Sequence, residues 1–203
     1  MQISQSAHVD TFTRENLPPR PTWPEFLFTL PELNYPPSIN CAAELLDRNA
    51  AGGAGARSCL VTDAETWTYS DLLARSNQVA HVLVGELGMV PGNRVLLRGP
   101  NNPWLVAGWF GVLKAGGVAV TTMPLLRAGE LRAVAEIAEV KLAVCDHRFA
   151  ADLQAAAIPG LATVLYGGSA PDDLTELAAS NAAGEGCSIR YVAAPTRIGK
   201  ITL

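Results

Sequence analysis

Two glycine-containing stretches resemble parts of a phosphate-binding loop, but neither has all the features that such a loop requires. Gly52, Gly53 and Gly55 lie between a predicted helix and a predicted strand. A phosphate loop needs the reverse order, because the phosphate binds at the amino end of the helix that follows the strand. Gly199-Lys200-Ile201 resembles the end of a Walker loop, but position 194 is alanine and position 201 is neither serine nor threonine. The sequence therefore predicts no phosphate loop in this chain.

The residues that could act as bases, nucleophiles or metal ligands do not form a known pattern. Three histidines lie in separate segments and outside any H-E-x-x-H motif: His8, His81 and His147. A turn and a helix cap account for three carboxylates that are close in sequence: Asp63, Glu65 and Asp71. Gly167-Gly168-Ser169 lacks the G-x-S-x-G spacing of a nucleophile elbow.

The four cysteines are widely spaced and include no C-x-x-C pair: Cys41, Cys59, Cys145 and Cys187. This spacing argues against a zinc site and predicts reduced, mostly buried thiols of a cytoplasmic protein. We therefore assign no catalytic, cofactor-binding or metal-binding residue from the sequence.

The composition limits the class of protein. The chain has 203 residues, of which 49% are hydrophobic and 17% are charged, with a formal net charge of -4. It can bury a substantial core, and it has no basic run that would bind nucleic acid. Residues 104–126 carry a single charge, Lys114, but a central lysine and the Gly116-Gly117 pair make a core helix followed by a core strand a better interpretation than a membrane span.

Strand and helix patterns alternate along most of the chain. A helix is expected over 41–48, capped by Ser38 or Asn40, followed by a flexible loop over 49–57. Two strands over 58–63 and 65–69 form a predicted hairpin, and Ser70 is the expected cap of a helix over 71–87. The apolar positions expected to face the core from this helix are Leu72, Leu73, Val79, Ala80, Leu83 and Val84.

The same alternation continues to about residue 180. Strands are expected over 92–99, 117–124, 140–146 and 161–167, and helices over 101–116, 128–139, 147–157 and 168–180. Asn101 or Asn102 is the expected cap of the 101–116 helix. This order predicts an α/β fold with a parallel sheet.

Two stretches resemble the first core motifs of the AMP-forming adenylating superfamily. Thr68, Tyr69 and Leu72 match its Thr-Tyr-x-x-Leu pattern, and Leu113 to Gly116 with Pro124 match its Leu-Lys-Ala-Gly pattern and closing proline. In physical terms, Gly116-Gly117 would end a helix without a Cβ penalty, and Pro124 would end strand pairing. Lys114 is interpreted as a cation at the carboxyl end of a helix dipole.

The segment over 16–47, which contains the proline- and aromatic-rich arm, narrows the resemblance together with TTMPLLRAGEL (121–131) and AVCD (143–146). These stretches resemble the benzoate-CoA and 2-aminobenzoate-CoA ligase branch. This likeness implies that an intact enzyme would use ATP and Mg²⁺ to adenylate an aromatic carboxylate and would then transfer the acyl group to coenzyme A. It also implies a phosphate loop, a ribose-binding aspartate and a catalytic lysine, none of which the sequence contains.

The resemblance therefore leads us to expect part of the large N-terminal domain of an AMP-dependent synthetase, incomplete at its C-terminal end and inactive alone. The expected divisions are an irregular arm over 1–37 whose aromatics pack on the body, a partial α/β domain over 38–180 and a divergent tail over 181–203, which a truncation or frameshift would explain. Such a fragment is expected to need no cofactor of its own and to self-associate through exposed apolar surface.

Two other interpretations are left open by the sequence. A non-catalytic binding or interaction module could use the same partial sheet, so whether this chain is an enzyme is undecided. An unrelated nucleotide-binding α/β protein ranks last, because it would require a phosphate loop that the sequence does not contain.

Overall fold

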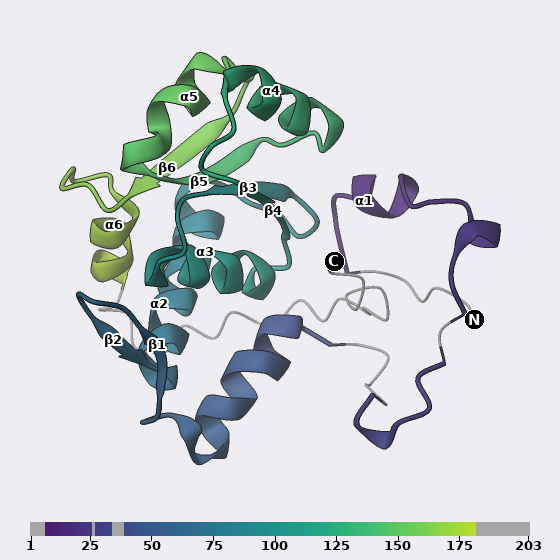
Figure 1. Ribbon diagram of the computed structural model, residues 1–203, viewed down its shortest axis with the longest axis vertical. Helices are drawn as coiled ribbons and strands as arrows, with labels where there is room; N and C mark the ends of the chain where they lie inside the picture. Colours follow the sequence, from purple (N-terminus) through teal and green to yellow (C-terminus); the bar gives the residue numbers. More distant parts are fainter. Residues whose placement is uncertain (1–6, 26, 34–38, 182–203) are drawn as a thin grey trace.

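The core of the protein is a parallel sheet of four strands in the order β4-β3-β5-β6 (Figure 1). The structure is a computed structural model that describes residues 7–25, 27–33 and 39–181. The strands are β3 (Arg94–Arg98), β4 (Val118–Thr122), β5 (Leu142–Asp146) and β6 (Ala162–Tyr166). Every residue of the inner strands β3 and β5 is buried, as expected for a parallel sheet covered on both faces. The predicted α/β class and parallel sheet are confirmed.

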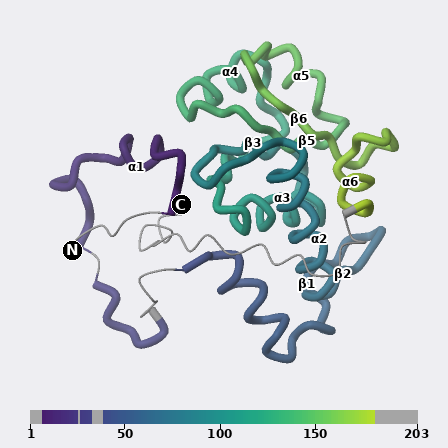
Figure 2. Tube along the Cα trace, turned by 180° about the vertical axis from the view of Figure 1, so that it is seen from behind, coloured from purple at the N-terminus to yellow at the C-terminus, as the bar shows by residue number. Residues whose placement is uncertain are grey.

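Helices cover both faces of this sheet. They are α3 (Pro103–Lys114), α4 (Ala128–Ile137), η6 (His147–Phe149) with α5 (Ala150–Ala155), and α6 (Leu174–Asn181). In Figures 1 and 2, α4 and α5 lie above the sheet, and α3 and α6 lie below it with α2. The core is divided accordingly into two clusters of buried side chains, one for each face.

The connection from α3 to β4 is built by two glycines, as the sequence predicted. Gly116 has a φ of 77°. The N–H groups of Gly116 and Gly117 donate to the carbonyls of Leu113 and Val112, at 3.1 and 2.8 Å. The last turn of α3 is thereby closed, and Val118 enters the sheet at once.

An antiparallel hairpin and a long helix precede the sheet. β1 (Ser58–Val61) pairs with β2 (Thr66–Thr68), as predicted, and α2 (Tyr69–His81) continues into η5 (Val82–Glu86). Thr68, rather than the predicted Ser70, caps α2, because Thr68 and Asp71 exchange hydrogen bonds in a capping box. Val84, predicted to be buried, is 47% exposed, since η5 has wider π-helical turns in which the 3.6-residue spacing fails.

The helix after residue 40 is longer than predicted. It comprises η3 (Ala43–Asp47) and η4 (Ala50–Ala54), so most of the expected loop over 49–57 is helical. Gly53 has a φ of 93° inside η4, which glycine adopts without strain. Asn40 caps the segment by accepting from the N–H groups of Ala42 and Ala43, at 3.0 and 3.2 Å. The alternative cap, Ser38, lies outside the described residues.

The N-terminal arm is irregular apart from α1 (Phe12–Glu15), η1 (Arg20–Thr22) and η2 (Pro31–Leu33). Both views show it beside the α/β core (Figures 1 and 2). The Trp23 indole donates to the Pro18 carbonyl at 2.7 Å and stacks with Arg20, both within the arm. Whether the aromatics over 17–37 pack on the body stays a prediction. Residues 8–12 contact the core at the turn before β3 and at Arg94. Phe26, Tyr35 and the predicted tail lie outside the described residues.

Candidate functional site

The carboxyl edge of the sheet between β3 and β5 is where a ligand would be expected. β3 leads through α3 to β4 on one side, and β4 then leads through α4 to β5 on the other side. Ligands of open α/β sheets bind at such a reversal of strand order, outside the carboxyl ends of the strands. Here the reversal brings together the residues that follow β3 and β5.

A carboxylate at the end of β5 is the centre of this edge. Asp146 is 2% exposed and accepts from the Arg148 guanidinium at 2.9 and 2.7 Å and from the Arg148 N–H at 3.0 Å. Asn102, the cap of α3, donates to the same carboxylate at 3.3 Å. Burial acts to raise the pKa of Asp146, but the bonds from Arg148 outweigh it and hold the pKa below its ordinary value. Asp146 is therefore held as an ion that joins β5 to α3.

Tyr166, at the end of β6, fills the space beside Asp146. Its side chain is 1% exposed, and burial raises the pKa of its phenol, so the hydroxyl stays protonated. A Cβ at Gly99 would lie 2.0 Å from this hydroxyl and 3.2 Å from the Cβ of Asp146. The reversal of strand order is thus closed by packed side chains.

Replacing Gly99 with alanine should destabilise the protein because of this close approach. Overpacking of this kind costs about 1–3 kcal/mol of unfolding free energy. Tyr166→Phe removes the hydroxyl that the new methyl would meet, so the double variant Gly99→Ala/Tyr166→Phe should recover part of the loss. Urea denaturation of the four proteins gives the coupling free energy. Gly129→Ala is the control, since a Cβ there meets nothing within 4 Å; strictly additive effects would contradict the prediction.

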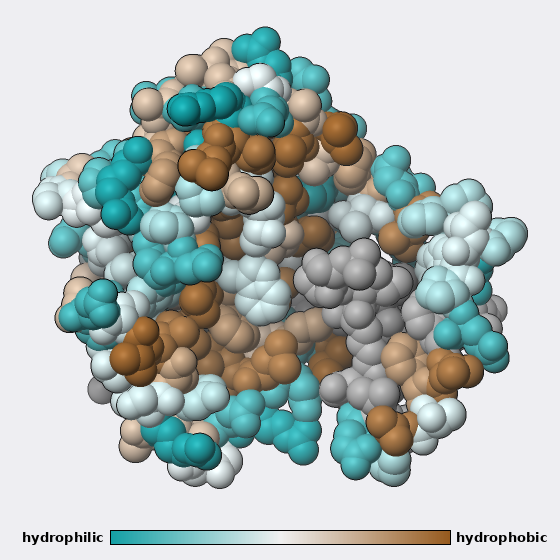
Figure 3. Space-filling view, viewed as in Figure 1, coloured by the Kyte–Doolittle hydropathy of each residue, from teal (hydrophilic) through white to brown (hydrophobic). Residues whose placement is uncertain are grey.

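A buried arginine holds two loops at the same edge. Arg98, the last residue of β3, is 0% exposed and donates to the carbonyls of Met123, Pro124 and Leu126, at 3.1, 2.9 and 2.9 Å. It also donates to the Phe149 carbonyl at 3.1 Å. The backbone after β4 is thereby fixed, while the side chains of Met123 and Leu125 are 62% and 76% exposed. Figure 3, in the same view as Figure 1, shows hydrophobic residues exposed at several separate places on the surface.

A groove of about 460 Å³ runs along β6, between α5 and the loop over 168–173. Its floor is apolar and includes Leu153, Ile158 and Leu165. His147 and the buried Asp173 also line the groove. Asp173 already accepts from the N–H groups of Gly168 and Thr175, at 2.7 and 2.9 Å, and so its carboxylate starts α6.

The residues weighed in the sequence as possible catalysts do not come together in the described part of the chain. His8 lies in the arm, His81 lies at the end of α2, and His147 lies 44% exposed beside Asp146. Asp71 caps α2, and Glu65 accepts from the Trp67 indole at 2.6 Å. The assignment of these carboxylates to local structure agrees with these contacts. Gly199-Lys200-Ile201 lies outside the described residues.

Cys41, Cys59 and Cys145 are not joined in disulfides, in agreement with the prediction of reduced thiols. Cys145 is buried, and burial raises its pKa to about 12, which keeps it protonated and unreactive. Cys41 and Cys59 are only partly buried, so the expectation of mostly buried thiols was wrong for them.

Within the described ranges, no group of three or more His, Cys, Asp or Glu side chains could hold a metal ion. None of the helices described there has the length and apolar character that a membrane crossing requires.

Lys114 has a larger structural role than its position at the end of α3 suggested. Its side chain is 1% exposed, and its ammonium lies 2.8 Å from the Asp47 carboxylate on η3. Asn40 supports the same contact by donating to the carbonyls of Leu113 and Lys114, at 3.0 and 3.3 Å. Burial lowers the pKa of Lys114, and Asp47 partly offsets this effect. The Leu-Lys-Ala-Gly stretch therefore attaches the helical segment of η3 and η4 to the core.

Sequence reasoning missed the residues that organise the carboxyl edge: Arg98, Asp146 and Tyr166. A usable signal was present for two of them, since β3 reads RVLLR and β5 reads LAVCD. A charged residue that closes an apolar strand is buried at the point where loops begin, and it must find partners there.

Comparison with known proteins relates most of the chain to one family. The sequence model of the family described as AMP-binding enzyme matches residues 46–195. A benzoate–CoA ligase of Thauera aromatica is 30% identical over 173 residues, which cover 83% of this chain and 32% of that protein. A 3-hydroxybenzoate–CoA ligase of Aromatoleum is 30% identical over 113 residues, which cover 56% of this chain and 21% of that protein. The chain thus spans a third or less of the length of these relatives.

Solved structures share the fold. The anthranilate CoA ligase AuaEII, in complex with anthranoyl-AMP, has a TM-score of 0.68 at 22% identity, over 74% of this chain and 30% of that chain. A benzoate CoA ligase from Burkholderia xenovorans LB400 has a TM-score of 0.63 at 24% identity, over 70% of this chain and 28% of that chain. At these identities the likeness concerns the arrangement of strands and helices.

Proposed function

This chain belongs to the AMP-binding enzyme family, and we propose that it is the N-terminal scaffold of an aryl-CoA ligase. The intact enzyme would join an aromatic carboxylate, either benzoate or 2-aminobenzoate, to AMP and then to coenzyme A, with release of pyrophosphate. The observation that carries the proposal is the 30% identity to a benzoate–CoA ligase over 173 residues. The proposed divisions are the arm over 1–37, the partial α/β domain over 38–180 and the tail over 181–203.

The described residues fit a scaffold better than a nucleotide site. ATP and Mg²⁺ would supply the adenylating chemistry, which needs cations and N–H donors around the phosphates. At the reversal of strand order, Asn102 already caps α3, and Arg148 already pairs with Asp146. Because Asn102 and Arg148 already have partners within the fold, we assign neither side chain a role in binding phosphate or a metal ion. We assign phosphate, metal and substrate binding to other parts of the polypeptide and place the enzyme in the cytoplasm, where ATP and coenzyme A are available.

A chimera tests this proposal directly. Residues 8–181 would replace the matching N-terminal segment of the Thauera benzoate–CoA ligase, and pyrophosphate release would be followed with ATP, Mg²⁺ and benzoate, 2-aminobenzoate or 3-hydroxybenzoate. We expect activity at least tenfold above background from the chimera and none from the 203-residue chain alone. The same ligase without its N-terminal segment is the matched control. Turnover by the chain alone, or a folded chimera without activity on any of the three acids, would overturn the scaffold proposal.

A non-catalytic binding or interaction module is the alternative. It is favoured by the two core clusters, which cover both faces of the sheet within the described residues. Under the scaffold proposal, the chain alone should self-associate through exposed apolar side chains such as Met123, Leu125 and Ile137. Sedimentation of the purified chain separates the two, because a stable monomer together with an inactive chimera would favour the module.

A further inference from the structure

The N-terminal arm is attached to the core through a short contact at the amino end of β3. The N–H groups of Val9 and Asp10 donate to the Pro91 carbonyl at 3.0 and 2.9 Å. A Cβ at Gly92 would lie 2.1 Å from the Asp10 carbonyl and 2.9 Å from the His8 Cβ, so the arm lies directly on this turn. The Phe12 ring lies 4.4 Å from the Arg94 guanidinium.

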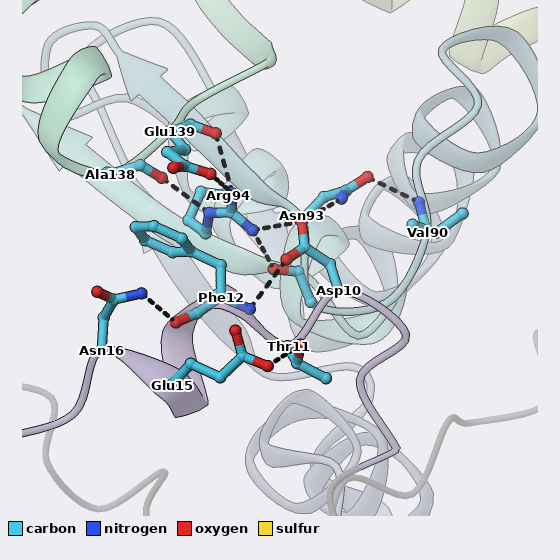
Figure 4. A network of polar contacts seen from close by, with 11 residues as sticks. Asp10, Thr11, Phe12, Glu15, Asn16, Val90, Asn93, Arg94, Ala138 and Glu139 are labelled. Atoms are coloured by element: carbon cyan, nitrogen blue, oxygen red, sulfur yellow. Dashed lines mark hydrogen bonds and ion pairs between the residues drawn. The ribbon is translucent and has the colours of Figure 1, made fainter.

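Arg94 is the residue on the core that receives the arm, and the core holds it independently of the arm (Figure 4). Its side chain is 5% exposed and donates to the carbonyls of Ala138, Glu139 and Gly92, at 2.8, 3.0 and 3.1 Å. The Glu139 carboxylate lies 3.8 Å away. The Asp10 carboxylate adds an ion pair from the arm. Arg94 therefore keeps most of its partners when Asp10 leaves.

Two titratable groups of the arm face this contact. The Asp10 carboxylate accepts from Arg94, from Asn93 at 2.9 Å and from the Phe12 N–H at 3.1 Å. Burial acts to raise the pKa of Asp10, but these bonds outweigh it and hold the pKa below 3.8. Burial lowers the pKa of His8 below 6.5, and the negative charge of Asp10 partly opposes that shift.

The pKa values of His8 and Asp10 are both lowered in the docked arm, so protonation of either side chain at low pH weakens the contact. A group whose pKa is lower in the docked arm than in the free arm favours docking at high pH, because the free arm binds the proton more tightly. The contribution of His8 is complete above about pH 6.5 and is lost as the pH falls through its lowered pKa. The contribution of Asp10 is lost in the same direction below about pH 3.8.

We propose that residues 8–12 form a releasable strap, which holds the N-terminal arm on the amino end of β3 through His8 and Asp10 and detaches in acid while the α/β core stays folded. Within the described ranges, the charged groups with printed contacts to the strap from the core are Arg94 and, beyond it, Glu139. The strap also donates two backbone hydrogen bonds to the Pro91 carbonyl and accepts one from Asn93, and the ion pair and the burial of His8 add the part of the contact that depends on pH.

An NMR titration of the His8 ring in the full chain tests the strap. In Asp10→Asn, release of the arm would expose His8 and raise its pKa towards 6.5. If the arm stayed docked, loss of the neighbouring negative charge would lower the pKa of His8 further. We expect a rise in this pKa, together with an increase of about tenfold in tryptic cleavage after Arg14. A fall or no change in the pKa of His8 would overturn the proposal.

The matched control is Glu15→Gln, because the Glu15 carboxylate accepts from Thr11 within the arm at 2.7 Å. This variant should leave the His8 titration and the cleavage rate unchanged. The His147 ring reports whether the core is folded in each variant. In the unmodified protein, the nuclear Overhauser contact between Phe12 and Arg94 should weaken as the pH falls below 6.5 and disappear once Asp10 is also protonated below pH 3.8, while contacts between β3 and β5 persist; its survival with both His8 and Asp10 protonated would also reject the strap.

Discussion

Arg98→Met is expected to lower the free energy of unfolding by about 4 kcal/mol or more, which is among the largest effects of single substitutions. The Arg98 residue is 0% exposed and satisfies four backbone carbonyls, three in the loop after β4 and one at the end of η6. Each hydrogen bond to a charged group contributes about 1.5–3 kcal/mol, and a buried acceptor that loses its donor costs about 1–3 kcal/mol. Methionine fills part of the volume but donates no hydrogen bond, so the loops at 123–126 and 149 lose their common anchor.

Urea denaturation measures this change, and Arg127→Met is the matched control. Arg98 and Arg127 both approach the Asp152 carboxylate, at 3.7 and 3.3 Å, but the Arg127 side chain is 80% exposed. We expect Arg127→Met to cost less than about 1 kcal/mol, as for other exposed ion pairs. Equal losses in the two variants would mean that the pair with Asp152, rather than the carbonyl contacts, is what Arg98 contributes.

Asp47→Ala is expected to lower the free energy of unfolding by about 3 kcal/mol, because it leaves the buried Lys114 charge without its carboxylate. The double variant Asp47→Ala/Lys114→Met should recover most of that loss, since a buried ion pair can be replaced by apolar side chains at little cost. The exposed pair of Glu44 and Arg48 on the same helical segment is the control, and its removal should cost about 0.5 kcal/mol or less.

The loss in Asp47→Ala should shrink as the pH rises from 7 to 10. Burial already lowers the pKa of Lys114, and removing Asp47 lowers it further. Above the pKa of the folded state the lysine is neutral, so stability increases with pH wherever the unfolded chain binds more protons. Denaturation midpoints at pH 7 and pH 10 measure the effect, and a loss that is the same at both would show that Lys114 is charged throughout.

The local patterns predicted most elements, and their failures have local causes. The helix–strand connection at Gly116-Gly117 and the cap at Asn102 follow from residue types a few positions apart. Ser70 was predicted as the cap of α2, although Thr68 carries an equivalent hydroxyl. Thr68 is the cap in the structure because it exchanges hydrogen bonds with Asp71. The loop expected over 49–57 was wrong because the helix that Asn40 caps runs on to Ala54, and the Gly55 and Arg57 carbonyls then accept from the Ser70 and Tyr69 N–H groups at the start of α2.

The candidate site was much less predictable than the fold. The absence of a phosphate-loop motif is a property of the sequence itself, and the sequence therefore indicated a scaffold. The roles of Arg98, Asp146 and Tyr166 could not be inferred, because their burial depends on the order of strands in the sheet. A strand pattern indicates that a segment is buried, but it does not say which strand lies next to it.

The sequence by itself determined the alternation of strands and helices, the parallel sheet and the family, because these depend on periodicity and short motifs. Only the tertiary structure decided how the buried charges are paired. Lys114 meets Asp47 across 67 positions, and Arg94 meets Asp10 across 84. An ion pair in the core requires two side chains to lose water at the same place, and the packing of distant elements decides where that place is.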